Sequence, residues 1–331
     1  MERLDRFMAR AAGAYYAARD PFGRGGDFTT APEISQAFGE VLGLWAATVW
    51  EAMGRPDPVL LVECGPGRGT LMADALRAAE DVARPFRAAA RIHLVEASPV
   101  LREAQARLLG AAVTAWHEDA AALPPGPMIL LANEFLDALP IRQFVRRGDG
   151  WAERFVEAGR FVEAPVEDAP GLPAEVLEGA VREVSPASLD FAARLGARLA
   201  RQGGAALVID YGPARSTLGE SLQAMRHHAP ADPLAEPGSV DITAHVDFEA
   251  IASAARAAGA AAHGPLPQGL LLSRLGLMSR AAMLAASRPR LGPEILSGAE
   301  RLVAAERMGQ LFKALALCDP RLPAPPGFEP D

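Results

Sequence analysis

Hydrophobic and polar positions alternate along this chain with two different periods. Short apolar segments with the length of buried strands stand at 59–62, 91–95, 113–116, 128–132 and 205–209. Segments with apolar residues every three or four positions, as in amphipathic helices, stand at 70–82, 100–108, 188–201 and 248–258. Strands that alternate with helices predict an α/β fold with a doubly wound, mostly parallel sheet.

Other segments depart from this alternation. Period-2 runs separated by Asp-Gly and Ala-Gly turns predict a β-meander at 141–162, followed by a proline-rich loop at 165–173. The polar stretch 213–246 has the length of a lid or binding loop. The pattern is helical over 268–305, with a break near 289–293, and the chain closes with a strand at 311–317.

The N-terminal part is expected to be helical. One helix is predicted to begin near Thr30 and run through Val49, with Thr30 and Glu33 spaced as in a capping box. We therefore predict an N-terminal helical segment with a loop that roofs the ligand site, 1–55, and an α/β domain, 56–331. The insertions in that domain are expected at about 141–186, 213–246 and 265–305.

Composition argues against several classes of protein, including those that bind nucleic acid or span a membrane. The net charge of -8 argues against nucleic acid as a partner, and no apolar run approaches the ~20 residues that cross a bilayer. The isolated cysteines Cys64 and Cys318 indicate neither a disulfide framework nor a metal site, which favours a reducing compartment. A single lysine, Lys313, among 33 basic residues suggests a GC-rich bacterial genome, and hence the cytoplasm, or the mitochondrial matrix for a eukaryotic source.

The stretch VLLVECGPGRG at 59–69 carries the clearest chemistry. Glu63 ends the strand, and Gly65, Gly67 and Gly69 let the backbone pass close to a ligand, unless they only make a tight turn. A dinucleotide site prefers GxGxxG, and a carboxylate before the turn would repel a pyrophosphate. The amino group and sulfonium of S-adenosylmethionine are cationic, so Glu63 favours that cofactor.

Two further acids follow the next strands of the predicted sheet. Glu96 ends the second strand, where it is placed to accept hydrogen bonds from the ribose hydroxyls. Asp119 follows the third strand and is placed to receive the adenine amino group. Because carboxyl ends of parallel strands meet at one edge, these residues are expected to share a crevice, although each could also be a solvated strand end.

The chain resembles the MidA-like methyltransferases in motifs that span nearly its whole length. These are GDFTTAPEISQAFGE at 26–40, VECGPGRGTLMADALR at 62–77, LVEASPVLREAQ at 94–105, ANEFLDALPIRQF at 132–144, IDYG at 209–212, DITAHVDF at 241–248 and MGQLFKALAL at 308–317. The resemblance implies a class I methyltransferase fold. Its eukaryotic members are mitochondrial complex I assembly factors that methylate an arginine of a complex I subunit.

Transfer to arginine sets demands on the substrate site. A guanidinium is a poor nucleophile until carboxylates hold it in a fork, so acids near the sulfonium are expected. Glu134 after the fourth strand and Asp137 about one turn later are the candidates, with Asn133 orienting cofactor or substrate. The alternative for Asn133 and Glu134 is a helix cap.

The remaining predicted site residues come from loops. Asp27 and Thr29 are expected to roof the cofactor, and four residues are expected to contact substrate: Glu33, Asp210, Tyr211 and His245. No metal, nucleic acid or membrane insertion is expected, and the oligomeric state is left open. Methylation of a small molecule or of another protein, and a non-catalytic assembly scaffold, are the alternatives that the sequence leaves.

Overall fold

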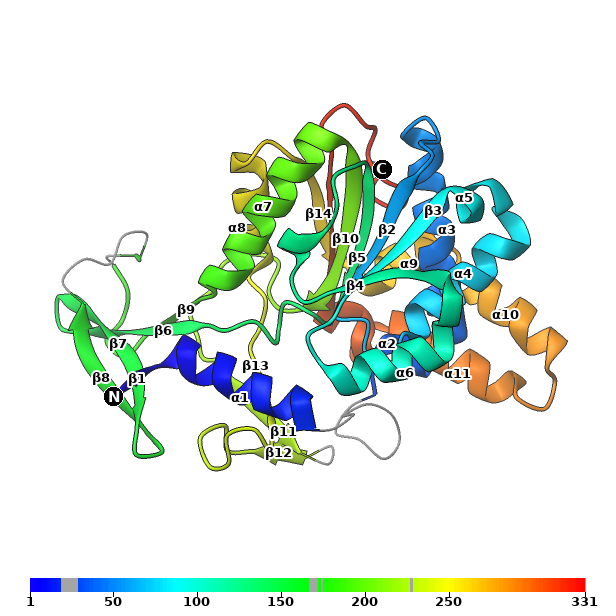
Figure 1. Ribbon diagram of the computed structural model, residues 1–331. Helices are drawn as coiled ribbons and strands as arrows, with labels where there is room; N and C mark the ends of the chain where they lie inside the picture. The colour runs from blue at the N-terminus through cyan, green and yellow to red at the C-terminus, as the bar shows by residue number, and fades with distance from the viewer. Residues whose placement is uncertain (19–28, 167–171, 174, 227–228, 331) are drawn as a thin grey trace.

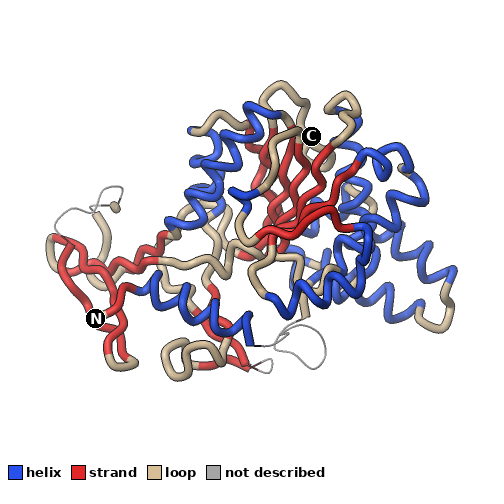
Figure 2. The backbone as a smooth tube through the Cα atoms, in the orientation of Figure 1, coloured by secondary structure: helices blue, strands red, loops and turns tan. Residues whose placement is uncertain are grey.

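A seven-stranded sheet forms the centre of the computed structural model, in the order β14-β15-β10-β5-β2-β3-β4 (Figures 1 and 2). The structure describes residues 1–331 apart from 19–28, 167–171, 174, 227–228 and 331. The strands are β2 (Val59–Cys64), β3 (Ala90–Val95), β4 (Val113–His117), β5 (Met128–Asn133), β10 (Gly204–Tyr211), β14 (Ala261–Pro267) and β15 (Phe312–Cys318). All neighbours pair in parallel except β15, which is antiparallel to β10 and β14, so the predicted fold class is confirmed.

Helices cover both faces of this sheet (Figure 1). One face is covered by α3 (Gln36–Ala52), α4 (Thr70–Val82), α5 (Arg84–Ala89), α9 (Gln268–Arg274), α10 (Leu277–Ser287) and α11 (Gly292–Val303). The other is covered by α7 (Pro186–Gln202) and α8 (Phe248–Ala257). Shorter or flanking helices are α1 (Leu4–Ala18), α2 (Ala31–Ile34), α6 (Pro99–Leu109), η1 (Gly110–Ala112), η2 (Ala120–Ala122) and η3 (Ala305–Gly309).

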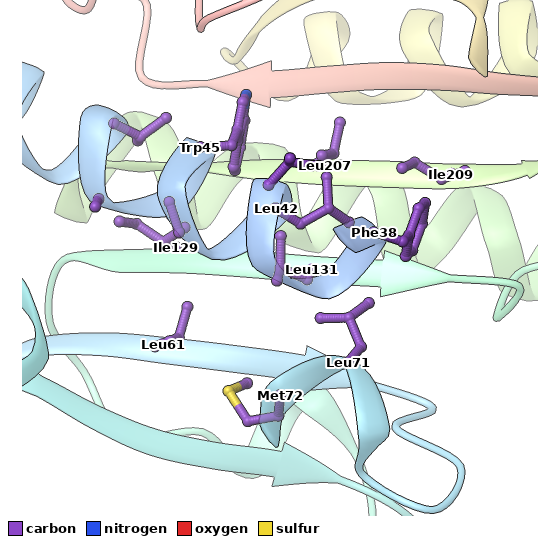
Figure 3. Packing of buried hydrophobic residues seen from close by; sticks show 14 of the residues in the cluster. Phe38, Leu42, Trp45, Leu61, Leu71, Met72, Ile129, Leu131, Leu207 and Ile209 are labelled. Atoms are coloured by element: carbon purple, nitrogen blue, oxygen red, sulfur yellow. The ribbon is translucent and has the colours of Figure 1, made fainter. Parts of the chain in front are cut away.

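Burial on both faces explains why the central strands are continuously apolar. On β5, Ile129 and Leu131 pack against α3, whereas Leu130 belongs to the cluster formed with α7 and α8. Figure 3 shows the first of these packings, in which Phe38 and Trp45 of α3 lie over the sheet. Because successive side chains point to opposite faces, a strand covered twice has no polar face to show.

Two smaller sheets extend the fold. The β-meander is confirmed as an antiparallel sheet of β1 (Glu2–Arg3), β6 (Arg142–Arg147), β7 (Gly150–Glu157), β8 (Arg160–Val166) and β9 (Val181–Val184), which projects from the body at the left of Figure 1. The other sheet consists of β11 (Gln223–Arg226), β12 (Ala229–Ala231) and β13 (Asp241–Thr243). Leu4 and Met8 of α1 share an apolar cluster with Val156 of the meander and Ile242 of β13, which joins the three parts.

Two expectations from the sequence are corrected. The helix predicted over 30–49 is broken at Ser35 into α2 and α3, and Thr30 makes no side-chain cap; Glu33 instead accepts a hydrogen bond from Thr70. The stretch 213–246 is not only a loop, because it contains β11, β12 and β13. Of the proline-rich loop predicted at 165–173, the first residues end β8, and 167–171 lie outside the described residues.

Among the described residues, no single helix is long and apolar enough to cross a membrane. The pair α9 and α10 reaches the required length and composition only together, with a bend of 65° between them.

Candidate functional site

A cavity of about 460 Å³ opens at the carboxyl edge of the central sheet, beside the ends of β2, β3 and β5. The sheet continues from β2 to β3 on one side and to β5 on the other, and this is the position where open α/β sheets bind ligands. Tyr16 of α1 and Phe191 of α7 complete its wall. The cavity is therefore shared by elements that are far apart in the sequence.

The glycine turn after β2 forms the floor of this cavity. Gly65 and Gly67 line it with φ angles of 65° and 53°, a left-handed conformation that side chains disfavour. A Cβ on Gly65 would lie 3.0 Å from Cδ2 of Phe135, so the position is also sterically closed. Gly69 lies further along, at the N-cap of α4, where its backbone faces Leu109 of α6.

Glu63 is buried next to this turn, with 3% of its surface exposed. Its Oε2 has no hydrogen-bond partner among the described residues. Burial raises the pKa of Glu63 to about 8, the Met72 N–H opposes that shift, and Glu96 adds to it. An orphaned, desolvated carboxylate of this kind is satisfied by a cationic donor, which fits the amino group of S-adenosylmethionine.

Glu96 lines the same cavity at the end of β3. Its Oε1 accepts a 2.8 Å hydrogen bond from the Ser98 N–H, and burial raises its pKa. Gln105, which the sequence analysis did not select, donates from Nε2 to Gly67 O at 2.7 Å and to Glu96 Oε2 at 3.4 Å. This buried amide therefore fixes the turn relative to Glu96; its place in the LVEASPVLREAQ motif was the available signal.

Asp119 also lines the cavity, close to Glu118 and Ala120. Its Oδ1 accepts a 2.7 Å hydrogen bond from the Ala121 N–H and so caps η2. Glu96 and Asp119 thus share this cavity, whereas Glu63 lines a small adjoining recess on the other side of Gly65 and Gly67. The acids and the glycine backbone between them fit a cationic nucleoside.

Glu134 follows β5 in a strained backbone conformation, with φ at 51°. Its Oε1 accepts hydrogen bonds of 3.1 Å from the Ala31 N–H and from Asn133 Nδ2. Burial raises the pKa of Glu134 to about 7, while the Ala31 hydrogen bond acts in the opposite direction. Asn133 Oδ1 is buried and finds no donor among the residues that the structure describes.

Asp210 accepts hydrogen bonds from the backbone of the turn that follows β5. Its fully buried Oδ2 accepts three backbone hydrogen bonds, from Phe135 at 3.1 Å, Leu136 at 2.9 Å and Asp137 at 3.2 Å. Burial and the neighbouring Asp137 raise the pKa of Asp210, and backbone donors oppose the shift. Its two oxygens are therefore engaged with backbone, in a positioning role that the sequence did not reveal.

Asp137 and Tyr211 lie beside this arrangement. Burial raises the pKa of Asp137, and a hydrogen bond from the Tyr211 side chain lowers it. The Tyr211 hydroxyl oxygen is also 2.7 Å from Thr243 Oγ1, so the two hydroxyl groups share a hydrogen bond. The structure places Tyr211 between the turn after β5 and the small sheet, since Thr243 ends β13.

The other predicted substrate residues lie apart from one another. Glu33 shares a recess of about 30 Å³ with Glu63, Asn133 and Glu134, and its Oε1 accepts a 2.6 Å hydrogen bond from Thr70 Oγ1. His245 lines a separate cleft, and its ring packs edge-on against Tyr211. Thr29 lines an outer groove beside α11, and the predicted roof residue Asp27 lies outside the described residues.

Within the described part of the chain, no group of three or more His, Cys, Asp or Glu side chains could hold a metal ion.

Comparison with known proteins gives consistent results. Residues 41–266 match a family described as S-adenosyl-L-methionine-dependent methyltransferases. The chain is 34% identical to the mitochondrial protein arginine methyltransferase NDUFAF7 homolog of Drosophila melanogaster, over 96% of this chain and 80% of that protein. It is also 34% identical to the Homo sapiens protein arginine methyltransferase NDUFAF7, over 96% and 79%.

A crystal structure shows the same fold with a ligand. It is that of a methyl transferase superfamily member from Burkholderia thailandensis bound to S-adenosyl-homocysteine, with 30% identity and a TM-score of 0.81. The similarity covers 99% of this chain and 88% of that chain.

Proposed function

Because the chain belongs to the MidA-like family of S-adenosylmethionine-dependent methyltransferases, we propose that it methylates an arginine side chain of a protein. The relatives named as protein arginine methyltransferases support this substrate class. The resemblance to complex I assembly factors makes a subunit of respiratory complex I the proposed target. The proposed place of action is the bacterial cytoplasm, or the mitochondrial matrix if the source is eukaryotic.

The half-buried carboxylate of Glu134 carries this proposal. It faces both the cofactor cavity and the small recess that contains Asn133 and Glu33. A guanidinium offers N–H donors in a planar fork, which these acceptor side chains match. When one edge of the guanidinium is hydrogen-bonded to Glu134, its positive charge is drawn toward that carboxylate. The outer nitrogen is then a better nucleophile toward the methyl group of the cofactor.

A residue of this chain can accept the proton that the proposed reaction releases. When bound, the cofactor supplies an already activated methyl group. The nitrogen–carbon bond forms as the sulfur–carbon bond breaks, and the proton lost from that nitrogen passes to Oε2 of Glu134. A pKa of about 7 suits Glu134 as a general base near neutral pH.

The test is methyl transfer from S-adenosylmethionine labelled in its methyl group. The protein is incubated with an extract of source cells that lack its gene, and the labelled product is separated by size and hydrolysed. We expect methylarginine in a protein fraction. Label confined to small molecules would contradict a protein substrate, and no binding of S-adenosylhomocysteine at millimolar concentration would favour the scaffold alternative.

A further inference from the structure

The recess beside Glu134 continues outward into a larger groove. The recess shares Gly65, Gly67 and Glu134 with the cofactor cavity, and it shares Glu33 and Arg68 with a groove of about 840 Å³. The three cavities therefore adjoin one another in a row, from the nucleoside site, past Glu134, to the outer groove.

The walls of this groove come from elements outside the cofactor cavity. One side is the end of α2 with Ile34, and the other is α11 and η3. A Cβ on Gly298 of α11 would lie 2.7 Å from Ile34 O, so the two walls touch at this point. The backbone of η3 is irregular at Arg307, as is frequent where a helix turn shapes a functional site.

The two openings differ in chemistry. The cofactor cavity is walled by apolar residues such as Leu139 and Phe191, which suit an adenosine. The groove is polar and carries both signs of charge: the acids are Glu33, Glu294, Glu300 and Glu306, and the bases are Arg68, Arg301 and Arg307. Such a lining suits a polypeptide, whose backbone offers donors and acceptors in turn.

The recess at the inner end of the groove is lined by hydrogen-bond acceptors that favour a cationic group. Asn133 lines the recess and is 9% exposed, and its Oδ1 has no donor among the described residues. The carboxylates of Glu33 and Glu134 line the same recess. Burial raises the pKa of Glu134, and Arg301 on α11 is one of the groups that oppose this shift, so a cation on the groove side already favours the carboxylate. An additional donor cation is what these acceptors lack.

We infer that the groove between α2 and α11–η3 is the entrance for the protein substrate. An arginine-bearing segment lies along the groove, and its side chain passes Glu33 to place the guanidinium against Asn133 and Glu134. The nucleoside of the cofactor lies on the other side of the glycine turn, in the cavity lined by Glu96 and Asp119. This inference rests on the proposed arginine methylation and adds the route and the surface that select the substrate.

Covalent modification of a cysteine introduced in the groove can block the proposed entrance and leave the cofactor site unmodified. Cys64 and Cys318 are buried, so a cysteine introduced at the exposed Ser297 is the selective target of a bulky maleimide. Val82→Cys, at a position 71% exposed at the end of α4, is the matched control with the same modification. Both proteins are compared before and after modification, so any folding defect of the substitution itself is seen separately.

Blocking the groove should stop protein methylation and spare cofactor binding. For modified Ser297→Cys we expect at least about a tenfold loss of label transfer to protein, with S-adenosylhomocysteine affinity unchanged by calorimetry. Modified Val82→Cys should retain both. If modified Ser297→Cys transfers label to protein at an unreduced rate, the proposed entrance is wrong but the proposed function stands. If the wild type transfers no label to protein, both the proposed function and the proposed entrance are wrong.

A small-molecule probe gives an independent test of the inner end. With S-adenosylhomocysteine bound, Nα-acetylarginine methylamide should bind the protein detectably by NMR, and the neutral citrulline analogue should not. The modified Ser297→Cys should lose this binding. Equal binding of the two analogues, or binding that survives the modification, would contradict the inference.

Discussion

The backbone N–H of Ala31 donates a 3.1 Å hydrogen bond to Oε1 of Glu134, although the two residues are 103 positions apart. This bond joins the first residue of α2 to the turn after β5. It fixes one carboxylate oxygen and leaves the other for a ligand. The position of Glu134 is thus set by the N-terminal segment as well as by the sheet.

Replacing Glu134 by Gln should separate catalysis from binding. The amide keeps the size of the side chain but loses the negative charge and the ability to accept a proton. We expect turnover of the protein substrate to fall by about 10²-fold or more, with unchanged affinity for S-adenosylhomocysteine. Glu103→Gln, the same change at an exposed position of α6, should leave both unchanged.

The same variant makes a stability prediction with a definite sign. Because the folded pKa of Glu134, about 7, lies above its usual value of 4.5, the ligand-free fold loses stability as pH rises from 4.5 to 7, and the loss levels off above 7. Glu134→Gln removes this loss, so its melting temperature relative to wild type should increase between pH 5 and pH 7 and then stay level. A relative decrease over that range would show that the carboxylate is stabilised by more than the Ala31 bond.

Gly65→Ala tests the close approach of backbone and ligand. Both Gly65, at φ 65°, and Gly148, at φ 53°, should lose about 1–2 kcal/mol of stability on conversion to Ala because each adopts a left-handed conformation. Only at Gly65 does the new Cβ meet a neighbour, Phe135, at 3.0 Å; at Gly148 no atom lies within 4 Å. Calorimetry should therefore show about a tenfold or larger loss of S-adenosylhomocysteine affinity for Gly65→Ala alone.

Cofactor binding should release a proton from Glu63. In the ligand-free protein its pKa is about 8, so at pH 7 the carboxyl is mostly protonated, and a bound amino cation lowers that pKa. Affinity for S-adenosylhomocysteine is therefore expected to rise between pH 6 and pH 8, by less than about tenfold per pH unit. Titrations in two buffers of different ionisation enthalpy count the protons, and Glu63→Gln is the control that should release one fewer.

Asp210→Ala should loosen the turn that carries Glu134. The change leaves the N–H groups of Phe135, Leu136 and Asp137 without their buried acceptor, which should cost about 3 kcal/mol or more in denaturant unfolding. Methyl transfer should decrease as well. Asp210→Asn keeps a carbonyl oxygen at the same place and should recover most of the stability; equal losses in the two variants would count against the backbone contacts as the cause.

The sequence by itself determined the parts of the fold that depend on local periodicity. Continuous apolar runs such as 59–62 and 128–132 are short and have no polar face, which is typical of strands covered on both sides. The spacing of Gly65 and Gly67 after Glu63 identified the turn and its ligand class, because backbone freedom and charge are properties of the residues themselves.

Tertiary structure alone decided which polar groups meet. Thr30 and Glu33 have the spacing of a capping box, yet Glu33 bonds Thr70 of α4 because α2 ends at Ile34 and lies against that helix. Likewise Asp210 reaches the backbone after β5 because β10 is its neighbour in the sheet. A local pattern specifies an element and its buried face, but a hydrogen bond between distant residues depends on strand order and helix placement, which only the folded chain defines.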